Sequence, residues 1–162
     1  MSVSRIELVS GLSTEEAQRV LDLGTPVRIP TGGSLFRLGD LADRVFVIER
    51  GRIALTMPMQ VRQQEEALLV EERLPGETVG WSALIPPHRF TLNAAAPLET
   101  DVLAIPRIAL FEYLDARPQI GYQLMRNLGE ILGQRLQVFQ AMWLREMQLG
   151  IDLRMQSSRG AA

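Results

Sequence analysis

The stretch LPGETVGWSALIPPHRFTLNAAA, residues 74–96, decides the fold of this chain. A glycine-rich turn leads into a short apolar segment, and a run with the composition of a β-strand follows. This order is typical of a loop that binds phosphate through its backbone N–H groups. However, Trp81 and Phe90 stand where a phosphate site would hold charged side chains. The stretch is therefore a ligand site, a site altered for another ligand, or a site that has been filled.

Short β-rich runs alternate with turn signals on both sides of this stretch, over residues 25–105. This alternation predicts an antiparallel barrel or sandwich. The polar residues 59–66 are expected to form the tip of a hairpin. The turn signals are Gly32-Gly33, Gly39-Asp40, Gly51, Pro58, Pro75-Gly76 and Pro97.

Helices are predicted before and after the strands. Ser13 and Glu16 have the spacing of a capping box, which predicts a short helix that ends near Gly24. Pro106 suits the first position of a helix over residues 106–115. Pro118 begins a second, much longer helical pattern that contains no further proline.

The long helix predicts a homodimer, because its apolar side chains recur at three- and four-residue spacing. A helix of about 30 residues is about 45 Å long, which exceeds the diameter of a domain of this size. A barrel alone cannot cover the stripe, and a second copy is the simplest partner. Gly129 and Gly133 either allow close backbone approach or only weaken the helix, by about 1 kcal/mol each. The predicted interface residues are Leu128, Leu132, Leu136, Phe139 and Trp143.

The composition excludes several classes of function. The chain has 162 residues, a net charge of −2, no cysteine and one histidine. It therefore lacks thiolate metal sites, cysteine nucleophiles and the histidine cluster of a cupin-type metal centre, so we expect no enzyme and no metal. Its basic residues are all arginine, and their number does not favour nucleic acid. With no signal peptide and no run of spanning length, we expect a cytoplasmic protein without membrane insertion.

Three segments together resemble the cyclic-nucleotide-binding domain of catabolite-activator-type bacterial regulators. They are GGSLFRLGDLADRVFVIERGRIAL (residues 32–55), LPGETVGWSAL followed by FTLNAAA (74–84 and 90–96), and LFEYLDARPQIGYQLMRNLGEILGQRL (110–136). The resemblance covers roughly residues 11–139. It implies a mainly β protein, a jelly-roll β-barrel flanked by an N-terminal helix and a long C-terminal dimerisation helix.

The resemblance also identifies a cassette, residues 80–91, that departs from the family pattern. In the family, a glycine–glutamate pair binds the ribose and an arginine followed by serine or threonine binds the cyclic phosphate. Gly80 and Thr91 keep the family residue types, but Trp81 replaces the glutamate and Phe90 the arginine. Arg89 would reach the site only through a bulge, because adjacent strand residues point to opposite faces. The residues of this degenerate ligand site are Gly80, Trp81, Ser82, Ala83, Arg89, Phe90 and Thr91.

The two replacements predict weak binding of cyclic nucleotides. Losing two hydrogen bonds to charged groups costs about 3–6 kcal/mol, a factor of about 10² to 10⁴ in affinity. Trp81 and Phe90 either line an apolar pocket for another effector or plug the old one. His88 and Arg89 are candidates for binding an anion at the rim of the cassette. The alternative is that they are only solvated. No cofactor is expected beyond a cyclic nucleotide or another small anionic effector.

We expect one domain in three parts. Residues 1–117 carry the N-terminal helix, the barrel and a short helix, residues 118–150 form the dimerisation helix, and residues 151–162 are a disordered tail. Too few residues follow Gly150 for the helix-turn-helix of the family's regulators, so no DNA binding is expected. A regulatory sensor, a ligand-free scaffold and a cyclic-nucleotide binder with shifted contacts remain alternatives, with the protein partner unknown. Polar residues expected on a solvated helix face or at a pocket mouth are Arg126, Asn127, Gln134 and Arg135.

Overall fold

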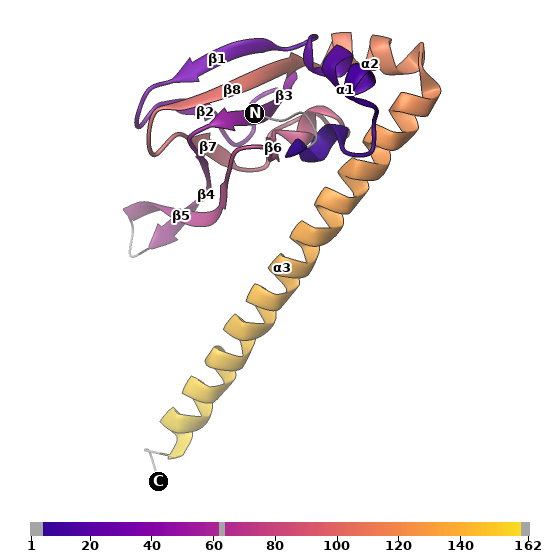
Figure 1. Cartoon of the computed structure of the whole chain (residues 1–162). Coiled ribbons are helices and arrows are strands. Elements are labelled where there is room, and N and C mark those ends of the chain that lie inside the picture. The colour runs from indigo at the N-terminus through magenta and orange to yellow at the C-terminus, as the bar shows by residue number, and fades with distance from the viewer. Residues whose placement is uncertain (1–4, 62–63, 160–162) are drawn as a thin grey trace. The chain divides into compact units, whose positions relative to one another are not determined.

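The computed structural model describes residues 5–61 and 64–159 (Figure 1). The chain divides into two compact units, Met1–Asn127 and Leu128–Ala162. The first unit holds the strands and the short helices. The second consists of the later part of the long helix α3, which runs over Pro118–Arg159 and so continues past the predicted boundary at residue 150.

Two four-stranded antiparallel sheets form the first unit, one with the order β1-β8-β3-β6 and the other with the order β2-β7-β4-β5 (Figure 1). Together they make the jelly-roll barrel that the sequence predicted. The strands are β1 Thr25–Ile29, β2 Ser34–Phe36, β3 Arg44–Arg50, β4 Ile53–Val61, β5 Gln64–Arg73, β6 Thr78–Val79, β7 Asn93–Ala95 and β8 Thr100–Pro106.

The core is densest at the two central strands of the first sheet, β3 and β8. Residues 45–48 and 102–105 are all buried. Four consecutive buried residues mean that both faces of each strand are covered, because neighbouring side chains point to opposite faces. These strands therefore form a fixed wall behind the cassette.

The helices of the first unit begin at the predicted signals. Helix α1, Thr14–Leu21, carries the predicted capping box: the Ser13 N–H donates to Glu16 Oε2 at 2.9 Å, and the Glu16 N–H donates to Ser13 Oγ at 3.2 Å. Helix α2 spans Arg107–Asp115, with Pro106 as its N-cap residue. The short 3₁₀ helix η2, Glu7–Val9, was not predicted.

Asn127 ties α3 to the N-terminal segment, so its predicted place on a solvated face or at a pocket mouth is wrong. Its side chain is 4% exposed, and Nδ2 donates to the carbonyl oxygens of Leu8 at 2.9 Å and Ser10 at 2.8 Å. A short 3₁₀ helix leaves carbonyl groups without partners at its end. Asn127 supplies the missing donor, a pairing that no periodicity in the sequence could indicate.

The β4–β5 hairpin is longer than predicted. Strand β4 passes through Pro58, where a break was expected, and both strands enter the predicted tip at residues 59–66. Strand β7 pairs with β4 only at residues 54–56. Among the described residues, β4 therefore has an open side at Pro58, where a missing N–H costs nothing. Residues 62–63, at the centre of the expected tip, lie outside the described residues.

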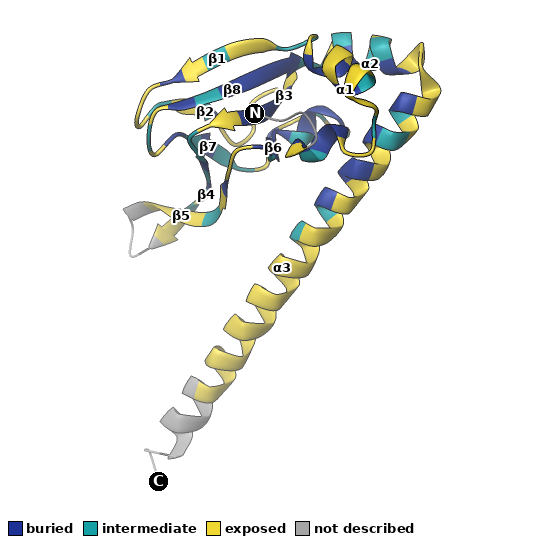
Figure 2. Cartoon of the chain, in the orientation of Figure 1, coloured by how far each residue is buried: buried dark blue, intermediate teal, exposed yellow. Residues whose placement is uncertain are grey.

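The second unit exposes most of the predicted apolar stripe (Figure 2). Leu128 is buried and Leu132 is half-buried. In contrast, Leu136, Phe139 and Trp143 expose 60%, 54% and 61% of their surface. A helix with this many exposed large apolar side chains has a face that water solvates poorly.

Candidate ligand-binding site

A left-handed glycine opens the cassette. Gly80 has φ +78° and caps the short 3₁₀ helix η3, Trp81–Ala83. A Cβ atom at Gly80 would lie 3.1 Å from Phe46 Cδ2 and 3.2 Å from Phe90 Cε1. Both the backbone angle and the crowding therefore require glycine at this position. This part of the family frame is intact.

The helix η3 is packed into the barrel rather than open to solvent. Ser82 and Ala83 are buried, and Trp81 is half-buried. His88 Nδ1 lies 3.0 Å from the Ala83 carbonyl oxygen, so one ring nitrogen of His88 contacts the backbone of η3. This contact holds the loop that connects η3 to Phe90.

Phe90 belongs to an aromatic cluster inside the barrel. Its ring stacks on that of Phe36, with centroids 3.8 Å apart and planes inclined by 8°. The Phe36 ring in turn lies 5.9 Å from that of Phe46. All three residues are buried, with exposed fractions of 5%, 8% and 6% for Phe90, Phe36 and Phe46. The position that the sequence resemblance assigns to the family's phosphate-binding arginine is therefore filled by packed aromatic surface.

Arg89 points away from this cluster. Its guanidinium Nη1 donates to the Gly39 carbonyl oxygen at 2.8 Å, and its backbone pairs with Leu41 in an isolated β-bridge. The Phe90 N–H donates to the Asp40 carbonyl at 3.0 Å, and the Gly39 N–H donates to the Phe90 carbonyl at 2.8 Å. These bonds fix the register that places Phe90 inside and Arg89 outside.

The strand that follows Phe90 is shorter than predicted. The run FTLNAAA was expected to be one strand, but β7 covers only Asn93–Ala95, and Thr91 is exposed. The Asn93 side chain explains the late start, because its Oδ1 accepts a hydrogen bond from the Leu38 N–H at 2.8 Å. A side chain that pairs with a backbone donor substitutes for one ladder bond.

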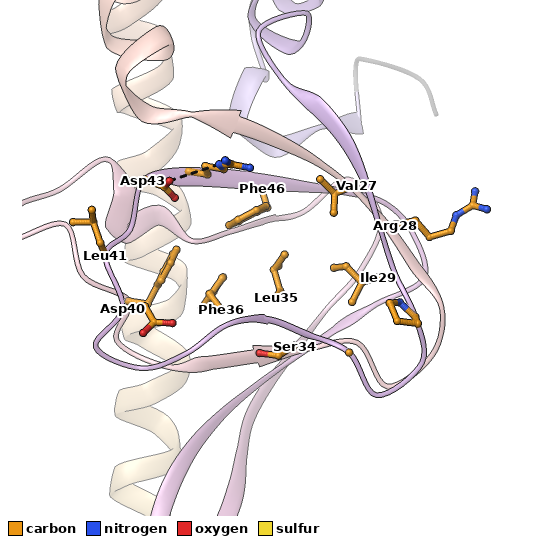
Figure 3. Close-up of a pocket in the computed structure, with 14 residues that line it drawn as sticks. Val27, Arg28, Ile29, Ser34, Leu35, Phe36, Asp40, Leu41, Asp43 and Phe46 are labelled. Carbon is orange, nitrogen blue, oxygen red and sulfur yellow. Dashed lines mark ion pairs between the residues drawn. The ribbon is translucent and has the colours of Figure 1, made fainter.

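Beside the aromatic cluster lies a cavity of about 640 Å³, which we call the slot (Figure 3). Figure 3 shows Val27 and Phe46 facing Leu35 and Phe36 across it, from strands β1, β3 and β2. The walls thus come from both sheets, at the edge where β1 and β2 end their respective sheets. Its apolar lining residues are Val27, Ile29, Leu35, Phe36, Phe46 and Phe90.

Charged side chains surround the mouth of the slot. The Asp43 and Arg44 side chains form an ion pair of 3.7 Å (Figure 3). Arg28 donates to Asp101 Oδ1 at 2.8 Å, and its side chain points away from the slot. Asp40 Oδ2 accepts a hydrogen bond from the Arg37 N–H at 3.2 Å. No ion pair to Asp40 occurs among the described residues, so its carboxylate is the uncompensated charge at this mouth.

The cassette and the slot share Phe90, which joins the predicted site to one that sequence reasoning missed. Phe36 and Phe46 were not predicted as site residues, although both lie in the runs SLFR and RVFVIE that predicted strands. Their proximity to Phe90 depends on the pairing of distant strands. Among the described residues, no three histidine, aspartate or glutamate side chains could hold a metal ion, and no helix could cross a membrane.

Comparison with known proteins identifies the class. Residues 26–117 match the cyclic nucleotide-binding domain family. The fold and the cassette frame define a domain of this type, and the chain belongs to the cyclic nucleotide-binding domain family. The likeness to catabolite-activator-type regulators predicted from the sequence is confirmed.

The relatives include both regulators and an enzyme. The cyclic AMP receptor protein of Thermus thermophilus is 26% identical over 90% of this chain and 61% of its own length. Glutaminase 1 of Bradyrhizobium diazoefficiens is 25% identical over 83% of this chain but 21% of its own length. The N-terminal domain of a transcriptional regulator from Streptomyces coelicolor has a TM-score of 0.68 and 26% identity, over 82% of this chain and 91% of that structure.

The chain spans between 7% and 61% of the length of the curated relatives that it matches. These proteins are therefore longer than the region that they share with this chain. The shared part is the cyclic nucleotide-binding domain, which is a regulatory module.

Proposed function

We propose that this domain is a non-enzymatic sensor whose cassette does not bind cyclic AMP or cyclic GMP tightly. The observation that carries the proposal is the burial of Phe90 against Phe36, at the position where the family binds the cyclic phosphate. A ligand phosphate placed there would lose its hydration without gaining a cation. Trp81 likewise offers no carboxylate to a ribose hydroxyl.

The backbone geometry retained in the cassette supports a sensor rather than a domain that has lost ligand binding. Gly80 keeps its left-handed geometry, and Ser82 and Ala83 keep their buried places in η3. The slot, which adjoins Phe90, offers a molecule of another kind a place to bind. Occupancy can act on a distant partner contact only if the ligand binds one arrangement of the protein better than another.

The output of the sensor, in this proposal, is a homodimer formed through the second unit. Leu136, Phe139 and Trp143 each expose more than half of their surface, and a second copy of the same stripe would cover them. The neighbouring exposed residues Val138, Met142 and Met147 enlarge the same apolar surface. Leu128 and Leu132 stand at the start of the proposed interface. The cytoplasmic location and the absence of DNA binding stay predictions, as does the further protein partner.

Two experiments on the purified full chain test the sensor. Calorimetry with cyclic AMP and cyclic GMP should give dissociation constants above about 100 μM. Low-micromolar binding would favour the alternative of a cyclic-nucleotide binder with shifted contacts. Native mass spectrometry should detect a co-purifying small molecule. A second measurement follows hydrogen exchange of the backbone amides after a mixture of metabolites is added. If no small molecule co-purifies and no metabolite changes the exchange, the ligand-free scaffold is favoured.

A further inference from the structure

We propose that the slot binds a flat, mainly apolar aromatic molecule that carries one amino group. The inference rests on the proposed sensor function and names the chemical class of its ligand. The slot has a volume of about 640 Å³, within the range of about 300–1,000 Å³ usual for small-molecule sites. Strands β1, β2 and β3 of the two sheets form much of its wall, and the loops that carry Asp40, Asp43 and Phe90 complete it.

The walls select a flat apolar body. Phe36 and Phe46 offer ring surface from facing sides of the slot, with Leu35 on the side of Phe36 and Val27 on the side of Phe46 (Figure 3). The Phe36 ring is already fixed in place by its stack on Phe90. A planar ligand that packs on a fixed ring avoids the entropy cost of ordering that ring. The aromatic cluster is therefore preorganised for binding a planar ligand.

The mouth selects against anions and for a cation. Arg44 is paired with Asp43, and Arg28 is held by Asp101, so both arginines of the lining are engaged by carboxylates. Asp40 has a backbone donor but no ion-pair partner among the described residues. An ammonium group on the ligand would supply one. Since Asp40 is exposed, the gain is modest, about two- to fivefold in affinity.

The experiment compares three probes with the same aromatic body and different charge: indole, tryptamine and indole-3-acetate. Saturation-transfer NMR on the full chain should give dissociation constants of about 0.1 to 1 mM for indole. Tryptamine should bind about two- to fivefold more tightly and indole-3-acetate more weakly. Asp40→Asn keeps the acceptor for the Arg37 N–H but removes the charge, and should abolish the advantage of tryptamine over indole.

A filling variant and a matched control locate the binding. Leu35→Trp should fill the slot and weaken all three probes at least tenfold, whereas Leu68→Trp, an exposed position outside the lining, should change none of them. If Leu35→Trp fails to fold, a measurement on the unchanged chain replaces this variant. It records isotope-filtered NOEs between bound indole and the methyl groups of Val27 and Leu35. Those NOEs are expected, and their absence in a bound complex would overturn the assignment.

Other outcomes overturn the proposal while leaving the sensor function to its own tests. Absence of indole binding at millimolar concentration removes the slot as a site, but a co-purifying molecule would still support a sensor. Tighter binding of indole-3-acetate than of tryptamine overturns the ligand class. If the probes bind but no molecule co-purifies, the slot is supported as a binding site. The amide-exchange experiment then decides whether the protein acts as a sensor.

Discussion

The Phe36 and Phe90 rings lie 3.8 Å apart in nearly parallel planes and join edge strand β2 to the cassette. The two residues are far apart in sequence, so the stack closes a long loop of chain. The surface that it forms is apolar, at the place where the sequence resemblance implies that the family binds an anion. Four of the five predictions below concern charges or rings whose positions this barrel fixes.

Replacing Phe90 by alanine should lower the free energy of unfolding by about 3 kcal/mol. The variant loses a buried side chain and its stack on Phe36, at a position that the slot partly opens to water. Urea unfolding measures the change. The adjacent exposed Thr91→Ala should change stability by less than about 0.5 kcal/mol. A loss below about 1 kcal/mol for Phe90→Ala would show that the stack is not part of the core.

Restoring the family residues should require the removal of Phe36 as well. Trp81→Glu with Phe90→Arg returns both charged groups, but the new arginine would have to occupy space beside the Phe36 ring. We expect the double variant to be destabilised and to bind cyclic AMP poorly, since a buried unpaired charge is costly. Adding Phe36→Ala should tighten binding at least tenfold over the unchanged chain, as calorimetry can measure. A folded triple variant without this gain would mean that the pocket differs beyond these three residues.

Much of this fold follows from local signals in the sequence. The capping box of Ser13 and Glu16, the proline at Pro118 and the spacing of turn glycines placed the helices and most strands correctly. The errors came where long-range pairing overrides local preference. Pro58 sits in a strand because β7 ends before it, and Asn127 is buried because a distant 3₁₀ helix needs a donor.

The site was only half predictable for the same reason. The cassette could be proposed from the sequence because its residues are contiguous, and so could the replacement by Phe90 of the arginine that the resemblance implies. The slot could not, because Val27, Leu35 and Phe46 come from three strands that meet only after the barrel closes. Whether Phe90 plugged or lined a pocket depended on Phe36, whose position the cassette sequence does not specify.

Asp101 should make the protein lose stability in acid. Hydrogen bonds from Arg28, then from Arg50, lower the pKa of the Asp101 carboxyl below its ordinary value. A lowered pKa stabilises the fold above the ordinary aspartate value of about 3.9, and this contribution is lost as the pH falls through the pKa of the folded state. Asp101→Asn should therefore be less stable than the unchanged chain at pH 7, and the difference should vanish in strong acid.

Thermal unfolding between pH 7 and pH 2.5 measures this difference. The control is Glu112→Gln, which removes an exposed carboxylate that forms no ion pair among the described residues. Its stability difference from the unchanged chain should stay nearly constant with pH. A difference for Asp101→Asn that persists undiminished at pH 2.5 would contradict the assignment of the effect to the carboxylate charge.

Removal of Arg73 should destabilise the fold, because this buried residue pairs with several carboxylates. Its buried guanidinium pairs with Glu7 at 2.9 Å, with Glu71 at 2.7 Å and with Glu77 at 3.4 Å. Arg73→Met should cost about 3 kcal/mol at pH 7, because Glu7 and Glu77 lose the guanidinium that pairs with them in a mostly buried setting.

The matched control is Arg52→Met, whose exposed pair with Glu72 at 3.2 Å should contribute less than about 1 kcal/mol. Urea unfolding at pH 7 measures both variants. A loss of stability for Arg73→Met that is as small as that for Arg52→Met would mean that the carboxylates do not depend on Arg73.

The proposed homodimer predicts a specific response of the second unit to charge. Phe139→Glu with Trp143→Glu places two carboxylates on the exposed apolar face. Burying a large apolar side chain contributes about 1.5–3 kcal/mol, so the pair of changes should cost at least about 3 kcal/mol of association, or about 100-fold in the dissociation constant. Sedimentation equilibrium at tens of micromolar should show a dimer for the unchanged chain and a monomer for the variant.

The control, Gln137→Glu with Gln148→Glu, adds the same charge to exposed positions away from the predicted stripe and should leave the dimer intact. A monomeric unchanged chain, or equal loss of the dimer in both variants, would rule out this interface.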